Sequence, residues 1–196
     1  FMGRQAAIGG TPSYTRPQCV GPIAVKDMEP CHEDTVNFRA AVDQHEPVDA
    51  FMNAASPGVI ALFQPDAHYG DHEEYLYALA NAMQAEYEAI VDAGFVLQLD
   101  SPDLGLGRHM MFKGESDTEY ERLAHLHVEA LNHAVRNIDA DRMRLHICWG
   151  NYEGPHTHDA PMAQVLPIAL AAKPQALVFE ASNPRHAHEW ATFVDT

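Results

Sequence analysis

An imidazole and a thiol lie two residues apart in the segment Leu145-His146-Ile147-Cys148-Trp149. Alternate side chains of an extended strand point to the same face, so His146 and Cys148 share one face. A thiolate and an imidazole placed in this way can bind one metal ion, for which zinc is the leading candidate. The alternative interpretation is a small buried cysteine beside a histidine that is simply hydrogen-bonded.

Polar residues also end three other apolar segments, at Ser56, Asp100 and Glu180. Functional side chains gather at the carboxyl ends of parallel strands. If the strand that ends at Glu180 pairs with the strand of His146, the Glu180 carboxylate lies beside His146 and Cys148. We expect that carboxylate to be paired or metal-bound, because an isolated buried charge is costly.

The other histidines have less specific spacing. His127 lies in a helical apolar stripe and is predicted to pack in the core, whereas His125 and His133 are predicted on wetter faces. The pairs at 156–158 and 186–188 could form a second metal site, but loop and helix-start histidines are the favoured interpretation.

Composition excludes several classes of partner. The 196-residue chain has a formal net charge of −16, so nucleic acid and anionic membranes are poor partners. It has 3 cysteines, an odd number at wide spacing, which indicates free thiols in a reducing cytosol. Of these, Cys19 and Cys31 are predicted to be structural. Without a signal-peptide pattern or an apolar run near the roughly 18 residues of a membrane span, we expect a cytoplasmic protein.

Short apolar segments alternate with amphipathic ones along the chain. The predicted strands are residues 19–24 (the weakest), 51–55, 95–99, 143–149 and 176–179. The predicted helices are residues 30–44, 71–93, 116–135, 159–172 and 183–193, with a turn at 56–58.

Strands separated by helices predict an α/β fold with a parallel sheet. The strands read as apolar on both faces, which is typical of a sheet covered by helices. A doubly wound sheet and a TIM (β/α)8 barrel both fit this pattern.

The segment His146-Ile147-Cys148-Trp149-Gly150-Asn151-Tyr152-Glu153-Gly154-Pro155-His156 resembles the zinc motif of the cobalamin-independent methionine synthase family, in its shorter single-barrel branch. The resemblance extends to residues 54–63, 86–100 and 178–183, in the same order. It covers most of the chain from about residue 19 onward.

This resemblance implies a TIM barrel that transfers a methyl group from 5-methyltetrahydrofolate to the thiol of homocysteine. It implies zinc bound by His146, Cys148, Glu180 and a cysteine of a later strand, although no cysteine follows Cys148. Asp100 matches the aspartate that binds the amino group of homocysteine, and we expect Ser56 to contribute to the same substrate site.

Length predicts an incomplete barrel. About five strand–helix units are fewer than the eight, in roughly 250 residues, of a complete TIM barrel. We therefore expect residues 1–196 to form a single partial barrel, a fragment that could associate with itself through open edges. The early Asp-Gly-Glu motif of the family is also missing.

Three alternatives remain open at this point. A related zinc enzyme attacks an epoxide with another thiol, coenzyme M, using a similar motif. The chain could also be a non-catalytic barrel fragment, or a metal-dependent hydrolase that uses Asp100 and the histidines.

Overall fold

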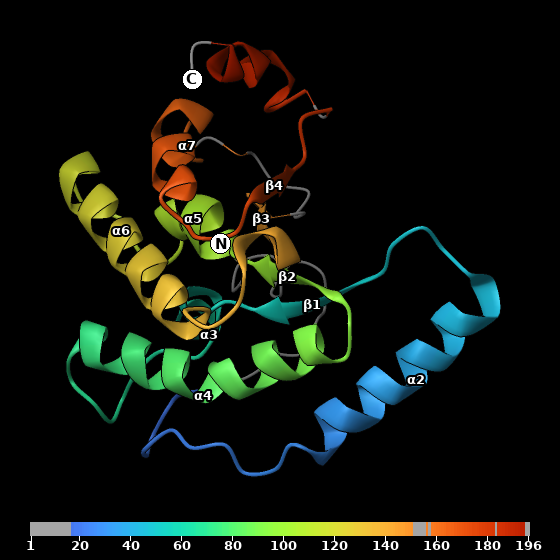
Figure 1. Cartoon of the computed structure of the whole chain (residues 1–196). Coiled ribbons are helices and arrows are strands. Elements are labelled where there is room, and N and C mark those ends of the chain that lie inside the picture. Colours follow the sequence, from blue (N-terminus) through green and yellow to red (C-terminus); the bar gives the residue numbers. More distant parts are fainter. Residues whose placement is uncertain (1–16, 151–155, 157, 183, 195–196) are drawn as a thin grey trace, which may run out of the picture.

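A computed structural model describes residues 17–150, 156, 158–182 and 184–194 (Figure 1). The strands are β1 (Phe51–Ala55), β2 (Val96–Asp100), β3 (Met143–Ile147) and β4 (Ala176–Phe179). The α-helices are α2 (Glu29–His45), α3 (Pro57–Phe63), α4 (His72–Asp92), α5 (Pro102–Gly105), α6 (Asp117–Ala134) and α7 (Met162–Leu170). The short 3-10 helices are η1 (Leu106–Arg108), η2 (Ala140–Arg142) and η3 (Ala187–Phe193).

Side-chain caps start the two longest helices of the core. Asp71 accepts a hydrogen bond from the Glu74 N–H at 2.8 Å, and Ser116 accepts one from the Glu119 N–H at 3.2 Å. Each cap satisfies an N–H group that has no partner within the helix. The starts predicted for α4 and α6 are therefore confirmed.

One predicted turn and one predicted helix start are wrong. Residues 56–58 open α3 rather than a turn, because the Ser56 hydroxyl caps the helix and Pro57 occupies its first turn. Helix α7 begins at Met162 instead of Asp159, and the Asp159 carboxylate contacts histidine side chains rather than capping the helix.

Two other elements also differ from expectation. Residues 19–24 pair only through an isolated bridge between Cys19 and Asp66, and Pro22 lacks the N–H that a longer ladder needs. The last helix is the 3-10 helix η3 rather than an α-helix; its predicted start at Asn183 lies outside the described residues.

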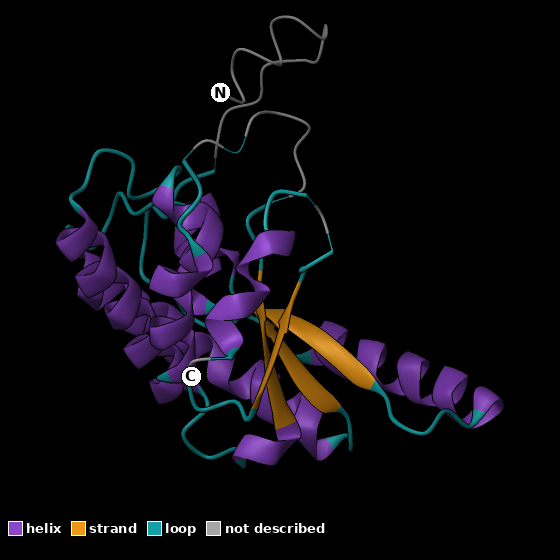
Figure 2. Ribbon diagram, turned by 90° about the horizontal axis from the view of Figure 1, so that it is seen from above, coloured by secondary structure: helices purple, strands orange, loops and turns teal. Residues whose placement is uncertain are grey.

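The four strands form one parallel sheet in the order β1-β2-β3-β4. Each strand pairs with its neighbour in sequence, whereas a doubly wound sheet reverses its order at a switch point. Helices α4, α6 and α7 pack on one side of the strands (Figures 1 and 2). This arrangement is consistent with part of a (β/α) barrel, with four strands in the described residues instead of about five. No helix in that part of the chain is long and apolar enough to cross a membrane.

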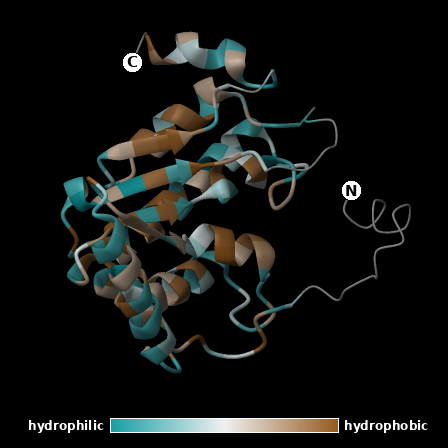
Figure 3. Ribbon diagram, turned by 90° about the vertical axis from the view of Figure 1, so that its right-hand side faces the viewer, coloured by the Kyte–Doolittle hydropathy of each residue, from teal (hydrophilic) through white to brown (hydrophobic). Residues whose placement is uncertain are grey.

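The two faces of the sheet differ in character. The face toward the helices is apolar, and the strands carry both hydrophobic and hydrophilic residues in Figure 3. Its buried side chains include Ala54, Leu97, Leu99, Leu145 and Ile147.

The opposite face carries polar side chains, so the prediction of two apolar faces is wrong. Its exposed or half-buried residues are Asn53, Gln98, Asp100, Arg144 and His146. The alternation of the strands places these polar residues between the buried apolar ones.

A buried carboxylate links the elements at the carboxyl edge of the sheet. Asp103 of α5 is 2% exposed, and its Oδ1 accepts a hydrogen bond from the Ser56 hydroxyl at 2.9 Å. Its Oδ2 lies 2.8 Å from Nδ1 of His127, whose Nε2 lies 2.9 Å from His72 Nε2. His127 is buried, as predicted, although its partners are polar.

We predict that Gly58→Ala strongly destabilises the fold. A Cβ atom at Gly58 would lie 2.0 Å from Asp103 Oδ2 and 2.4 Å from His127 Nδ1. Displacing a buried, hydrogen-bonded carboxylate should lower the free energy of unfolding by about 3 kcal/mol or more. Urea denaturation measures this loss, and Gly21→Ala is the control because nothing lies within 4 Å of its added Cβ. Equal stability of the two variants would contradict the prediction.

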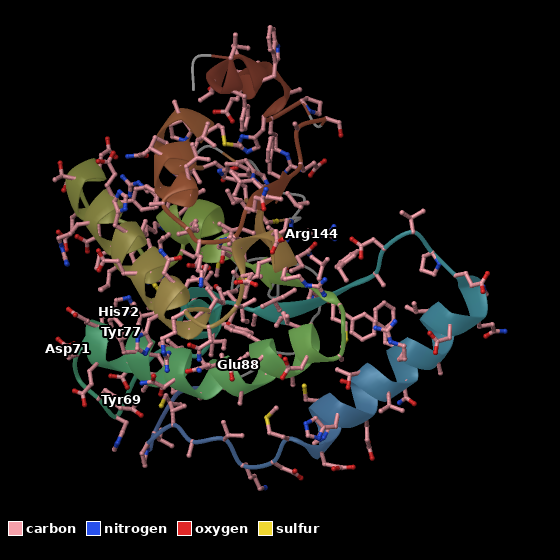
Figure 4. All side chains as sticks on the ribbon, viewed as in Figure 1. Tyr69, Asp71, His72, Tyr77, Glu88 and Arg144 are labelled. Atoms are coloured by element: carbon pink, nitrogen blue, oxygen red, sulfur yellow. The ribbon has the colours of Figure 1, made fainter. Side chains whose placement is uncertain are left out.

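We also predict an acid-dependent loss of stability through His72, which lies at the first turn of α4 (Figure 4). Burial, and next the neighbouring His127, lower the pKa of His72 from 6.5 to about 4. The unfolded chain therefore takes up the proton first, and the stability due to neutral His72 is fully present above pH 6.5.

That stability is lost as the pH falls from 6.5 toward about 4. Allowing for the partial exposure of the ring, the loss should be about 2 kcal/mol. Urea denaturation across this range should show a smaller loss in His72→Gln than in the wild type. The exposed His125→Gln should retain the wild-type pH dependence, and an identical profile for His72→Gln would refute the assignment.

Candidate metal centre

A cavity of about 90 Å³ lies at the carboxyl ends of β3 and β4. The three side chains predicted to bind zinc, His146, Cys148 and Glu180, all line it. The other lining residues are Ile147, Trp149, Gly150, His156, Arg185 and His186. The described structure therefore brings the three predicted ligands to one place.

Strand pairing accounts for the position of Glu180. In the parallel register His146 pairs with Val178 and Ile147 with Phe179, so Glu180 follows directly beside Cys148. The expectation that Glu180 is buried is wrong, because its side chain is exposed while it lines the cavity. An exposed carboxylate stays hydrated, so Glu180 has no cost of burial that a partner must offset.

A carboxylate on the neighbouring strand orients His146. Asp100 Oδ1 lies 3.0 Å from His146 Nδ1 and also accepts a hydrogen bond from Gln98 Nε2 at 2.9 Å. Asp100 Oδ2 accepts a hydrogen bond from Asn53 Nδ2 at 2.9 Å. With Nδ1 facing the carboxylate, the other ring nitrogen of His146 is the one left for a metal ion. Histidine ligands of metal ions commonly have such a carboxylate partner.

Backbone groups hold the Cys148 segment in place. The Gly150 N–H donates a hydrogen bond to Cys148 Sγ at 3.2 Å. On the other side, the Leu106 N–H donates to the Cys148 carbonyl at 3.2 Å. Gly105 permits this approach, because a Cβ there would lie 2.8 Å from that carbonyl oxygen.

Zinc fits the chemistry of these donors. Imidazole nitrogen, thiolate sulfur and carboxylate oxygen are the ligand atoms that zinc takes in proteins. Cys148 has a free thiol, as do Cys19 and Cys31. The segment that resembles the zinc motif continues through residues 151–155, which lie outside the described residues.

The predicted substrate residues have structural partners. Ser56 is 2% exposed, and its hydroxyl contacts Asp103 and the Val59 N–H. Asp100 lies beside His146 and is partly open to solvent, with 28% of its side chain exposed. Substrate binding by Ser56 and Asp100 stays a prediction.

A second group of ligand-type side chains lies beside the cavity. Within the described ranges, the group of three whose ligand atoms all lie within 4.8 Å of one another is His156, Asp159 and His186. His146, Cys148 and Glu180 share a cavity but do not meet that distance. From the sequence alone we expect the two histidines in a loop and at a helix start, and Asp159 at the start of another helix. The spacing of His156 and Asp159, three residues apart, was the available signal.

We predict that Asp100→Asn weakens zinc binding by roughly 10- to 100-fold, because the amide is a poorer acceptor for the His146 ring N–H. Competition with a chromophoric chelator measures the affinity. Asp139→Asn is the control, since Asp139 is exposed and its side chain makes no helix-capping hydrogen bond. Equal zinc affinity of the Asp100 and Asp139 variants would contradict this positioning role.

Comparison with known proteins gives distant similarity. No family model matches the chain. It is 26% identical over 161 residues to "Methionine synthase" of Saccharolobus solfataricus (strain ATCC 35092 / DSM 1617 / JCM 11322 / P2), which covers 81% of this chain and 43% of that protein. "Methionine synthase" of Saccharolobus islandicus (strain L.S.2.15 / Lassen #1) matches with the same identity and coverage.

The chain thus spans less than half the length of these curated relatives. Its similarity covers most of its own residues and supports a methionine synthase-like family.

Proposed function

We propose that this chain is part of a zinc-dependent thiol methyltransferase that converts homocysteine to methionine with 5-methyltetrahydrofolate as the donor. The observation that carries the proposal is the single cavity lined by His146, Cys148 and Glu180. The similarity to proteins named methionine synthase supports the choice of reaction.

His146, Cys148 and Glu180 are the residues that would hold the metal. Zinc held there would lower the pKa of a substrate thiol and so would supply a thiolate near neutral pH. A catalytic zinc site keeps one position open, which the sulfur of the substrate would take.

The neighbouring residues position the reactants. Asp100 holds the His146 ring through Nδ1, and its carboxylate has further lone pairs for the ammonium group of an amino-acid substrate. The Gly150 N–H steadies the Cys148 sulfur. Both contacts fix groups of the site before the substrate arrives, which is one way in which a protein accelerates a displacement.

The methyl transfer needs no reagent beyond the two substrates and solvent. The homocysteine sulfur attacks the methyl carbon, and a C–S bond forms as the bond from that carbon to N5 of the folate breaks. The electron pair of the broken bond stays on N5, which takes a proton from solvent.

The first test is zinc content. We expect the purified chain to retain zinc that Cys148→Ser loses, because the thiolate is the strongest zinc ligand of the set. Cys31→Ser is the matched control, a half-buried free thiol on α2. Inductively coupled plasma mass spectrometry gives the metal content, and circular dichroism confirms folding. A folded wild-type chain with no Cys148-dependent zinc would contradict the proposal and favour a non-catalytic fragment.

The second test is the reaction. The zinc-loaded full-length protein that contains this chain is expected to form methionine from homocysteine and 5-methyltetrahydrofolate, and its Cys148→Ser variant is expected to form none. Product from coenzyme M and an epoxide instead would contradict homocysteine as the substrate. Chromatography of the sulfur-containing products distinguishes the two results.

A further inference from the structure

A buried histidine–carboxylate cluster joins two segments that are distant in the sequence. His156 and Asp159 precede α7, while His186 precedes η3. Asp159 Oδ2 lies 2.6 Å from His156 Nδ1 and 3.1 Å from His186 Nε2. The three side chains are only 4%, 5% and 9% exposed, in the order His156, Asp159 and His186.

Both ring nitrogens of His186 face carboxylates. Its Nδ1 lies 2.7 Å from Glu189 Oε2, and its Nε2 lies 3.1 Å from Asp159 Oδ2. A neutral imidazole has a single N–H, so it can donate to one of these carboxylates and presents a lone pair to the other. A cation between His186 Nε2 and Asp159 would satisfy both atoms, as would a second ring proton. Glu189 then accepts the Nδ1–H, the partner arrangement common around metal-binding histidines.

A second, independent observation concerns the other oxygen of Asp159. Asp159 Oδ1 is buried and has no hydrogen-bond partner in the described structure; the His109 Nδ1 atom lies 3.4 Å away. A buried carboxylate oxygen without a hydrogen bond is costly. A metal ion bound by the Asp159 carboxylate would compensate this oxygen.

Packing holds the cluster rigid. The Trp149 ring stacks on His186 with a centroid distance of 4.3 Å, and its Nε1–H donates to the Ala160 carbonyl at 2.8 Å. The Met162 N–H donates to the second oxygen of Glu189 at 2.8 Å. These contacts fix the His186 ring and the carboxylate behind it.

We propose that His156, Asp159 and His186 bind a divalent transition-metal ion, with zinc the best fit, at a site distinct from that of Cys148. Two imidazoles and one carboxylate form a common three-residue zinc set that leaves one position open. Ligand atoms of a tetrahedral zinc ion lie roughly 3.3 Å apart. Asp159 Oδ2 lies 3.1 Å from His186 Nε2 and 2.6 Å from His156 Nδ1, so the closer pair must separate when the ion binds. His156 and His186 also line the cavity of His146 and Cys148, so the two sites share one space.

The test uses the Cys148→Ser chain, which lacks the thiolate of the other site. After removal of metal by a chelator and reloading with Zn²⁺, we expect one zinc per chain. Adding Asp159→Asn should remove that zinc, and adding Glu189→Gln should weaken binding by roughly 10- to 100-fold. His188→Gln is the control, an exposed histidine two residues from His186, and should leave the zinc in place.

A folded Cys148→Ser chain that binds no zinc would overturn the inference, as would full zinc content after Asp159→Asn. If the Asp159 variant does not fold, the melting temperature of Cys148→Ser with and without Zn²⁺ decides instead. We expect zinc to raise that temperature, and no change would overturn the inference.

The results also distinguish failure of this second site from failure of the proposed function. In the wild-type chain loaded with Co²⁺, a thiolate-to-cobalt absorption band should survive Asp159→Asn and disappear in Cys148→Ser. Zinc that is removed by Asp159→Asn but unaffected by Cys148→Ser would support this second site while contradicting the methyltransferase proposal.

Discussion

The carboxyl edge of the sheet depends on one buried carboxylate. Asp103 accepts a hydrogen bond from the residue that starts α3 and contacts a histidine of α6, while it belongs itself to α5. A buried charge of this kind is tolerated only when its partners are complete. The absence of a side chain at Gly58 makes room for it. Through these contacts, α5 is held where its Gly105 meets the backbone of Cys148.

Two clusters of polar side chains lie next to the elements that these contacts hold in place. On the open face of the sheet, the pairing of Asp100 with His146 brings a carboxylate and an imidazole together across neighbouring strands. Beyond the strand ends, loops bring His156 and His186 to Asp159. The first set has a thiol available and fits thiol chemistry, whereas the second has only nitrogen and oxygen donors. The cavity between them is lined by histidines of both sets.

Much of this arrangement could be predicted from the sequence. Periodicity and N-cap residues locate α4 and α6, and apolar segments locate the four strands, because these signals are local. The parallel pairing that brings Glu180 beside Cys148 follows from the βα alternation. The polar face of the sheet could not be predicted, because the strands are short and their sequences mix polar residues with a majority of apolar ones. The contacts of Asp159 and Asp103 could not be predicted, since each depends on segments brought together only by the fold.

X-ray absorption at the zinc edge shows whether the Cys148 sulfur binds the metal. In the Asp159→Asn chain, which isolates the Cys148 site, we expect one sulfur neighbour at about 2.3 Å and the rest nitrogen or oxygen. Adding homocysteine should raise the count to two sulfur neighbours. A zinc shell of nitrogen and oxygen alone, unchanged by homocysteine, would contradict the account.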